Sequence, residues 1–304
     1  MLRIALFLAT NLAILIIASI TLNILGVQHY LDQSGTGLNL TSLLIFCAVF
    51  GMTGSMISLL LSKTMAKWSA KVQLIKEPQN QHEQWLYSTV ERLAQQAGIG
   101  MPEVGVFPSS QSNAFATGWN KNNALVAVSA GLLNKMNREQ VEAVLAHEIG
   151  HVANGDMVTL SLLQGVINTF VMFFARIIGT AIDRLVFKNE RSGGIGYFMM
   201  VMFIEMILAV LASTIVMWFS RYREYRADAA GAALTSPQAM ISALQALKRE
   251  YEQPLDQTAP LQTDMPEAMQ AFGISPGFKQ SIAKVFASHP PLDMRIAALQ
   301  TIQG

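Results

Sequence analysis

The sequence predicts an α+β membrane protein, with four transmembrane helices and a mainly helical polar part that contains a small β-sheet. Two observations predict this class. Hydrophobic residues make up 52% of the 304 residues and charged residues only 13%, about half the charged share of a soluble domain. The apolar residues are concentrated in four long blocks, and three short runs of β-branched and aromatic residues lie between the second block and the third.

The composition also excludes several classes of protein. A disordered chain needs low hydrophobicity and high charge, and this chain has the opposite. The 21 Lys and Arg residues are balanced by 20 Asp and Glu residues, which leaves no basic excess for binding nucleic acid. Cys47 is the single cysteine, so the fold does not depend on an internal disulfide.

The first two apolar blocks predict an N-terminal transmembrane hairpin within residues 1–62. The blocks run from Ile4 to Val27 and from Leu38 to Ser62, carry no charged residue and are each long enough to cross a bilayer. A buried core helix is the alternative for either block, and a secretory signal is the alternative for the first. The length of the first block and the second block directly after it favour two membrane helices.

The third and fourth blocks predict a second hairpin within residues 157–220. Met157 to Ile182 is interrupted only by Arg176, and Ile195 to Ser220 only by Glu205. Ionisable groups at membrane depth are costly unless they are paired, so we expect Arg176 and Glu205 to form an ion pair. A transport role for these two residues is the alternative.

The positions of Lys and Arg predict the orientation in the membrane. Basic residues follow the second block and the fourth block, whereas the loop between the first two blocks has none. The positive-inside rule therefore places the N-terminus and both polar segments in the cytoplasm. The loop between the third and fourth blocks is also basic, so a re-entrant second hairpin remains an alternative to a spanning one.

The polar segments, residues 63–156 and 221–304, predict a set of short elements. Helical periodicity predicts helices at Gln81 to Gln96, Arg138 to Ala153 and Pro237 to Tyr251, and a last helix after Pro290 and Pro291. Strands are predicted at Val104 to Phe107, Ala114 to Trp119 and Ala124 to Ser129. Asn137 is the predicted N-cap of the second helix, with Gln140 in the capping-box position. Four prolines between residues 253 and 277 predict a long loop.

The strongest chemical signal is His147-Glu148-Ile149-Gly150-His151, on the helix predicted from Arg138. Residues four apart lie on one face of a helix, so the two imidazoles can hold one zinc ion. Glu148 lies on an otherwise apolar face, where a carboxylate is costly unless it has a partner or a function. The alternative for Glu148 is a charge at the edge of the core.

A catalytic zinc ion takes three protein ligands, and the residues alone leave the third ligand open. Glu224 and Asp228 are four apart on a helix that leaves the membrane on the same side, among small residues that permit close packing. Glu224 could complete the site, and Asp228 could accept a hydrogen bond from the other nitrogen of a histidine. Asp156, five residues past His151, is a weaker candidate, and ion pairs with neighbouring arginines are the alternative for Glu224 and Asp228.

Over nearly its whole length the chain resembles the HtpX-type membrane zinc endopeptidases of bacteria, relatives of the type I CAAX prenyl proteases. The resemblance rests on the motifs above and on Asn113-Ala114-Phe115-Ala116, Asn154-Gly155-Asp156 and Ser288-His289-Pro290-Pro291. It implies a gluzincin-like metalloprotease domain with one zinc ion per chain. In this family the residues that match His147, His151 and Glu224 hold the zinc, and the one that matches Asp228 supports a ligand.

The same resemblance implies how substrate is bound. Asn113, Ala114 and Phe115 match an edge strand that binds an extended peptide by backbone pairing, whereas the residues alone fit an ordinary sheet strand equally well. His289 is implied to face the site and stabilise the oxyanion; the alternative is an exposed histidine before a helix.

The implied activity is zinc-dependent hydrolysis of peptide bonds in misfolded or membrane-associated proteins, as quality control under stress at the bacterial inner membrane. Zinc would activate water and polarise the carbonyl, and Glu148 would take the proton of the water. Three alternatives stay open. They are a CAAX-type prenyl protease, whose relatives have more spans than this chain, a non-catalytic zinc-stabilised membrane scaffold, and a channel or transporter.

Overall fold

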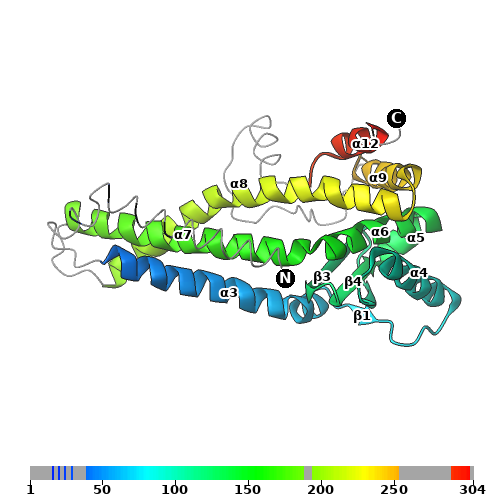
Figure 1. The fold of residues 1–304 in the computed structure, drawn as a ribbon, viewed down its shortest axis with the longest axis horizontal. Coiled ribbons are helices and arrows are strands. Elements are labelled where there is room, and N and C mark those ends of the chain that lie inside the picture. Colours follow the sequence, from blue (N-terminus) through cyan, green and yellow to red (C-terminus); the bar gives the residue numbers. More distant parts are fainter. Residues whose placement is uncertain are drawn as a thin grey trace. The chain divides into compact units, whose positions relative to one another are not determined.

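The computed structural model describes residues 39–187, 194–252 and 289–301, together with the single residues Ile16, Ile20, Ile24 and His29. The described chain is mostly helical and contains one four-stranded sheet (Figure 1). It divides into two compact units. One comprises Met1–Ser58 and Leu160–Val216, and the other comprises Leu59–Thr159 and Met217–Gly304.

Three described helices are long and apolar enough to cross a membrane. They are α3 (Leu40–Ser69), α7 (Asp156–Leu185) and α8 (Ile195–Leu234), and they contain the second, third and fourth apolar blocks. The first predicted span, Ile4 to Val27, lies outside the described residues except for three isoleucines, so a fourth transmembrane helix stays a prediction. The Pro-rich loop predicted from residue 253 also lies outside them.

In the first unit, small residues and one ion pair join the apolar helices. A Cβ atom on Gly51 of α3 would lie 2.8 Å from the carbonyl oxygen of Gly165 on α7, so these two backbones are close together. Nη1 of Arg176 lies 3.0 Å from Oε1 of Glu205, and this pair connects α7 with α8. The pairing expected from the sequence is therefore confirmed.

The sheet of the second unit has the order β1-β2-β4-β3. Its strands are β1 (Gln73–Leu74), β2 (Glu103–Phe107), β3 (Ala114–Asn120) and β4 (Asn123–Ser129). β2 pairs with β4 in parallel, whereas the other two pairings are antiparallel. The three predicted strands are present, but β1 was missed because two residues are too short to show alternation. The order leaves β3 at one end of the sheet.

The described part of the second unit also contains the ends of α3, α7 and α8 and five whole helices. The whole helices are α4 (Gln81–Ala97), α5 (Ala130–Lys135), α6 (Arg138–Asn154), α9 (Pro237–Glu252) and α12 (Leu292–Thr301). Both ends of α6 are fixed by local chemistry. Asn137 and Gln140 form the predicted capping box, and Gly155 ends the helix with a positive φ of 68°, which favours glycine. These two caps define the length of the helix that carries His147 and His151.

α6 is buried on two sides. Leu145, Ile149 and Val152 pack in a core with residues of β4 and α4, and Ala143 packs in a second cluster with α9 and α12. Each fully buried side chain of this size contributes about 1.5–3 kcal/mol of transfer free energy. The core therefore holds α6 firmly in place between the sheet and the later helices.

Candidate metal centre

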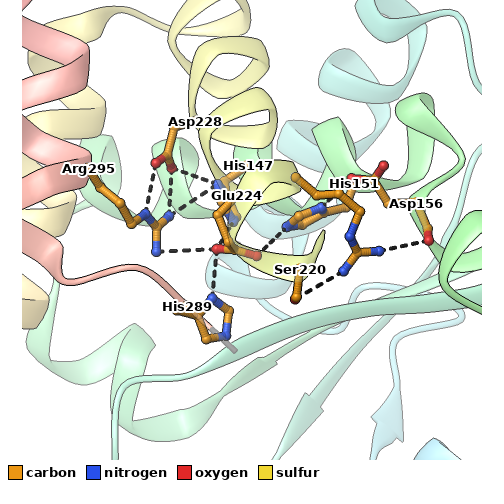
Figure 2. Close-up of polar contacts among 9 residues, drawn as sticks. His147, His151, Asp156, Ser220, Glu224, Asp228, His289 and Arg295 are labelled. Atoms are coloured by element: carbon orange, nitrogen blue, oxygen red, sulfur yellow. Dashed lines mark hydrogen bonds and ion pairs between the residues drawn. The ribbon is translucent and has the colours of Figure 1, made fainter. Parts of the chain in front are cut away.

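Small residues bring α6 and α8 together at the candidate site. A Cβ atom on Gly150 would lie 3.0 Å from Cβ of Ala230, and one on Gly231 would lie 3.1 Å from the backbone nitrogen of His147. Only glycine fits such backbone approaches without displacement of its neighbours. The close packing places Glu224, two turns before Gly231 on α8, beside the histidines of α6 (Figure 2).

His147, His151 and Glu224 converge and could hold a metal ion. Nε2 of His151 lies 3.2 Å from Oε1 of Glu224, and Nε2 of His147 lies 3.6 Å from Oε2. One ligand atom from each residue lies within 4.8 Å of the other two. Two imidazole nitrogens and one carboxylate form a donor set that zinc accepts at catalytic sites, so these residues fit such an ion.

The second nitrogen of each histidine contacts a different carboxylate. Nδ1 of His147 lies 2.9 Å from Oδ1 of Asp228, and Nδ1 of His151 lies 2.7 Å from Oδ2 of Asp156 (Figure 2). When Nδ1 donates its proton to a carboxylate, Nε2 is left as the metal-binding nitrogen. Both Nε2 atoms lie on the side of Glu224.

Asp156 was the weaker candidate for the third metal ligand, and its position does not suit that role. Its carboxylate contacts the nitrogen of His151 that does not face Glu224. Its backbone oxygen accepts a hydrogen bond of 2.8 Å from Nη1 of Arg223, a buried residue of α8 that sequence reasoning missed. Arg223 therefore ties α8 to the residue that orients His151.

Arg295 of α12 is the other residue that sequence reasoning missed. Its Nε lies 2.8 Å from Oδ2 of Asp228 and its Nη2 lies 2.6 Å from Oδ1, and its Nη1 is 3.4 Å from Oε2 of Glu224. The guanidinium group thereby pairs with both buried carboxylates of α8. A signal for it was present in the sequence. Leu292, Arg295 and Leu299 share one helical face, and a charge on an apolar face needs a buried partner.

Electrostatics in the site favour protonated histidines when no metal is bound. Burial lowers the pKa of His151, but its hydrogen bonds with Asp156 and Glu224 outweigh burial and raise the pKa to about 10. Burial also lowers the pKa of His147, and Asp228 and Glu224 likewise raise it overall. Metal binding must therefore displace protons from these imidazoles.

The remaining residues expected at the site lie around one cavity, with one exception. Asn113, Ala114, His147, Glu148 and His289 all line this cavity. His289 precedes α12, and its Nδ1 lies 2.7 Å from Oε2 of Glu224 while 62% of its side chain is exposed.

The exception is Phe115. Successive side chains of a strand point to opposite faces of the sheet, and the ring of Phe115 packs 5.4 Å from that of Phe107 instead of lining the cavity. The side chain of Phe115 therefore does not line this cavity, and a role of its backbone in substrate binding stays a prediction.

The chain resembles known proteins over nearly its whole length. Residues 80–303 match the family described as Peptidase family M48. The chain is 62% identical over 299 residues to Protease HtpX of Hahella chejuensis, covering 98% of this chain and 99% of the relative. It is 63% identical over 301 residues to Protease HtpX of Alcanivorax borkumensis, covering 99% of this chain and 98% of the relative.

A solved structure shares the fold. The crystal structure of Ste24p from S. mikatae superposes with a TM-score of 0.57 at 21% sequence identity and covers 93% of this chain. The chain spans only 64% of the length of Ste24p. At this identity the likeness concerns the fold alone.

Proposed function

Because the chain belongs to peptidase family M48, we propose that its metal is one zinc ion held by His147, His151 and Glu224, and that Glu148 is the general base. The family match and the similarity to the two HtpX proteases indicate that the chain is a membrane metalloendopeptidase that acts on polypeptides. The convergence of two Nε2 atoms on the carboxylate of Glu224 carries the zinc assignment. A non-catalytic scaffold would not need the adjoining cavity, which Glu148 also lines.

A zinc ion at this site would supply a Lewis acid and lower the pKa of a water molecule beside it. Glu148 follows His147 directly and lines the same cavity, so its carboxylate is placed to accept the proton of that water and to pass it to the leaving amine. Asp228 and Asp156 hold the two imidazoles in the orientation that leaves Nε2 available.

Two groups that can donate hydrogen bonds support a site for the negative charge that would develop on the substrate. His289 and Arg295 both line the cavity, and both contact Oε2 of Glu224. His289 is mostly exposed and can reach a bound carbonyl oxygen, whereas Arg295 is held by Asp228. We assign stabilisation of the oxyanion to His289, with the fixed charge of Arg295 behind it.

The substrate is proposed to be an unfolded or membrane-associated polypeptide bound in extended form. β3 lies at one end of the sheet, and its first residue, Ala114, lines the cavity together with Asn113. A strand at a sheet edge can pair with any extended backbone, which gives affinity with little dependence on sequence. We place this reaction on the cytoplasmic side of a bacterial inner membrane, in the removal of damaged proteins.

The variant Glu148→Gln tests the proposal. A carboxamide cannot accept the proton of water, so zinc should remain bound at one ion per chain while cleavage of an unfolded polypeptide falls by at least about 100-fold. Zinc content and cleavage rate are measured on the same detergent-purified sample. Glu139→Gln, an exposed change on the same helix, is the matched control and should alter neither quantity. Loss of zinc from Glu148→Gln, or unchanged cleavage, would contradict the assignment.

A further inference from the structure

The last turns of α3 belong to the second unit and lie against one edge of its sheet. The uncharged part of α3 ends at Ser62, after a stretch long enough to cross the hydrocarbon core of a bilayer. The next residue, Lys63, contacts Oδ1 of Asn123 at the start of β4, and its Nζ lies 3.1 Å from Oε1 of Glu103 at the start of β2. The turn between β3 and β4 therefore lies beside the position where α3 is expected to leave the membrane.

This edge of the sheet exposes large apolar side chains. We define the hairpin edge as residues 100–103 and 119–123. Trp119 is 43% exposed and Met101 is 37% exposed. A hydrogen bond of 3.0 Å from the amide of Gly100 to the turn joins their two segments. Tryptophan is enriched where a membrane meets water, so its exposure at this position fits contact with the bilayer surface.

The charge of the hairpin edge points to the same partner. Nζ of Lys63 and Nζ of Lys67 lie 3.1 and 2.5 Å from the two carboxylate oxygens of Glu103, and Lys121 is exposed at the turn. In the described contacts of this edge, three ammonium groups thus accompany one carboxylate. Lysines close to a bilayer are attracted to anionic headgroups. Because the edge adjoins the end of an apolar helix, lipid headgroups are the partner within its reach.

β3 connects the hairpin edge with the catalytic groups. Its last residue, Asn120, is opposite Asn123 in the sheet, and its first residue, Ala114, lines the cavity together with His147 and Glu148. Six steps of about 3.3 Å make this path roughly 20 Å long. In the described part of the chain β3 is the end strand of the sheet, so its outer edge can pair with a bound peptide along this whole path.

A second path through the chain gives a similar distance. His147 precedes Met157, the first residue of the third apolar block, by ten residues. Nearly all of this path is helical, and a helix rises 1.5 Å per residue, so the two residues are at most about 15 Å apart. Two separate segments of the chain therefore place the metal group roughly 15–20 Å from the expected membrane boundary.

We propose that the hairpin edge rests on lipid headgroups, and that β3 leads a polypeptide leaving the bilayer from there to the metal group. The proposal rests on the proposed function, because β3 can guide a chain only if the substrate pairs with it. The length of β3 then sets a minimum distance. A peptide bond closer than about six residues to the transmembrane segment of the substrate does not reach the metal while the chain stays paired.

The contact with lipid is measured without use of activity. Lys121→Cys and Arg249→Cys, each in a Cys47→Ser background and labelled with a fluorophore, are reconstituted as full-length protein in vesicles of phosphatidylethanolamine and phosphatidylglycerol. Arg249 is the control, since its neighbour Glu250 accepts a hydrogen bond of 3.1 Å from the amide of Ser112, at the other end of β3. Lipids that carry a quencher on the headgroup should cause loss of fluorescence at position 121 and leave position 249 nearly unchanged.

The minimum distance is measured with membrane-anchored reporters in the same vesicles. Each reporter has one transmembrane segment, a flexible spacer and one identical segment that the enzyme cuts in an unfolded polypeptide. The spacer sets the scissile bond roughly 3 to 12 residues from the membrane, in steps of about three. One series has its transmembrane segment before the spacer and the other has it after, because pairing with β3 can be antiparallel or parallel. In at least one series kcat/KM should rise about tenfold or more between the shortest spacers and those of about nine residues, and then stay constant.

A double variant links the two measurements. Lys121→Glu with Met101→Ser weakens the contact with lipid and changes no residue of β3 or of the metal group. It should lower kcat/KM for the anchored reporters by on the order of 3- to 10-fold and leave cleavage of a soluble unfolded polypeptide in detergent unchanged. Arg249→Glu reverses one exposed charge on α9 and should alter neither rate. Thermal unfolding shows whether the variants are folded; if the double variant is not, the labels and the spacer series decide.

The outcomes separate this inference from the proposed function. Equal quenching at both labels overturns the contact with lipid, and equal cleavage at every spacing overturns the guiding role of β3. Either result refutes the inference and leaves the protease assignment intact. Absence of any zinc-dependent cleavage by the wild-type protein would overturn the proposed function and, with it, the guiding role of β3.

Discussion

The Nδ1 and Nε2 atoms of His147 and His151 contact different carboxylates in the site. The two Nδ1 atoms contact Asp228 and Asp156, and the two Nε2 atoms face Glu224. One carboxylate on each Nδ1 fixes the tautomer and the ring plane, which is how ligands are held before the metal arrives. On the proposed ligand assignment, the preorganisation of the site therefore depends on Asp156 and Asp228 as much as on the ligands.

Substitution of either carboxylate should weaken metal binding without abolishing it. Asp156→Ala and Asp228→Ala should each raise the Kd for zinc by roughly 10–100-fold, the usual effect of removing a group that orients a ligand. Competition with a chelator measures this directly. Asp228→Ala should have the larger effect, because it also leaves the buried guanidinium group of Arg295 without its bidentate partner. Unchanged affinity in both variants would show that the ligands do not need these partners.

Zinc affinity should also depend steeply on pH. With a pKa of about 10 in the metal-free protein, His151 carries protons on both ring nitrogens at pH 7 to 9. Zinc must displace the proton on Nε2. The apparent Kd should therefore rise about tenfold for each unit of pH decrease per displaced proton. Asp156→Asn removes a carboxylate that raises this pKa, so its pH dependence should be shallower. A wild-type Kd that is constant from pH 7 to pH 9 would contradict the protonation state.

Helical spacing in the sequence indicated His147, Glu148 and His151 as one candidate group. Spacing offered Glu224 and Asp228 only as candidates, and the resemblance to the family implied their roles. Sequence reasoning missed Arg223 and Arg295, whose partners come from remote segments. Arg295 lies 67 positions from Asp228 in the sequence, yet the two form a bidentate pair. The sequence alone shows that Arg295 lies on an apolar helical face, but it does not show which carboxylate forms the ion pair with it.

At the scale of elements, the contact between α6 and α8 determines whether the site can form. The sequence indicated small residues on α8, and the structure shows why two glycines are needed. A Cβ atom would approach Ala230 to 3.0 Å at Gly150 and the backbone nitrogen of His147 to 3.1 Å at Gly231. Glu224 is held next to the histidines only while these two backbones stay close.

Gly231→Val should therefore lower stability and zinc affinity together. Its added carbons meet the backbone of α6 and Sδ of Met240, and overpacking of this kind costs about 1–3 kcal/mol. Thermal unfolding and zinc titration provide the two readouts. Gly54→Val on α3 is the matched control, because nothing lies within 4 Å of an added Cβ there. If Gly231→Val binds zinc as tightly as the wild type, the close packing of α6 and α8 is not required.

Local signals predicted most elements but not the parallel pairing within the sheet. The capping box at Asn137 predicted where α6 begins, and the structure confirms it. The parallel pairing of β2 with β4 and the helix α5 had no comparable signal. Parallel pairing joins strands that are distant in sequence, and a six-residue helix is too short to show periodicity.

At the scale of the whole molecule, the metal group constrains how the chain crosses the membrane. His151 lies six residues before the third apolar block, and Glu224 lies four residues after the fourth. Their side chains are 3.2 Å apart, so the third block must begin on the side where the fourth block ends. If these two blocks form the proposed membrane hairpin, the hairpin makes no net crossing, whether it spans the bilayer or re-enters it. Composition predicted the membrane class, but it could not fix this constraint.

Thiol accessibility tests the orientation. Single cysteines at Ser69 and at the exposed Gln245 of α9, in a Cys47→Ser background, should be protected from an impermeant reagent on intact cells. Both should react once the membrane is permeabilised. Labelling at Gln245 with protection at Ser69 would contradict the cytoplasmic assignment and the ligand role of Glu224 together. A cysteine at Ser192, outside the described residues, would distinguish a spanning hairpin, if labelled, from a re-entrant one, if protected.

The zinc content of Glu224→Ala tests the central assignment most directly. The wild-type protein should purify with one zinc ion per chain, and Glu224→Ala should retain almost none at the same free zinc concentration, because a third of the donor set is gone. Asp156→Ala, with its carboxylate on the far nitrogen of His151, should regain one zinc ion at saturating concentration. One tightly bound zinc ion in Glu224→Ala would contradict the account.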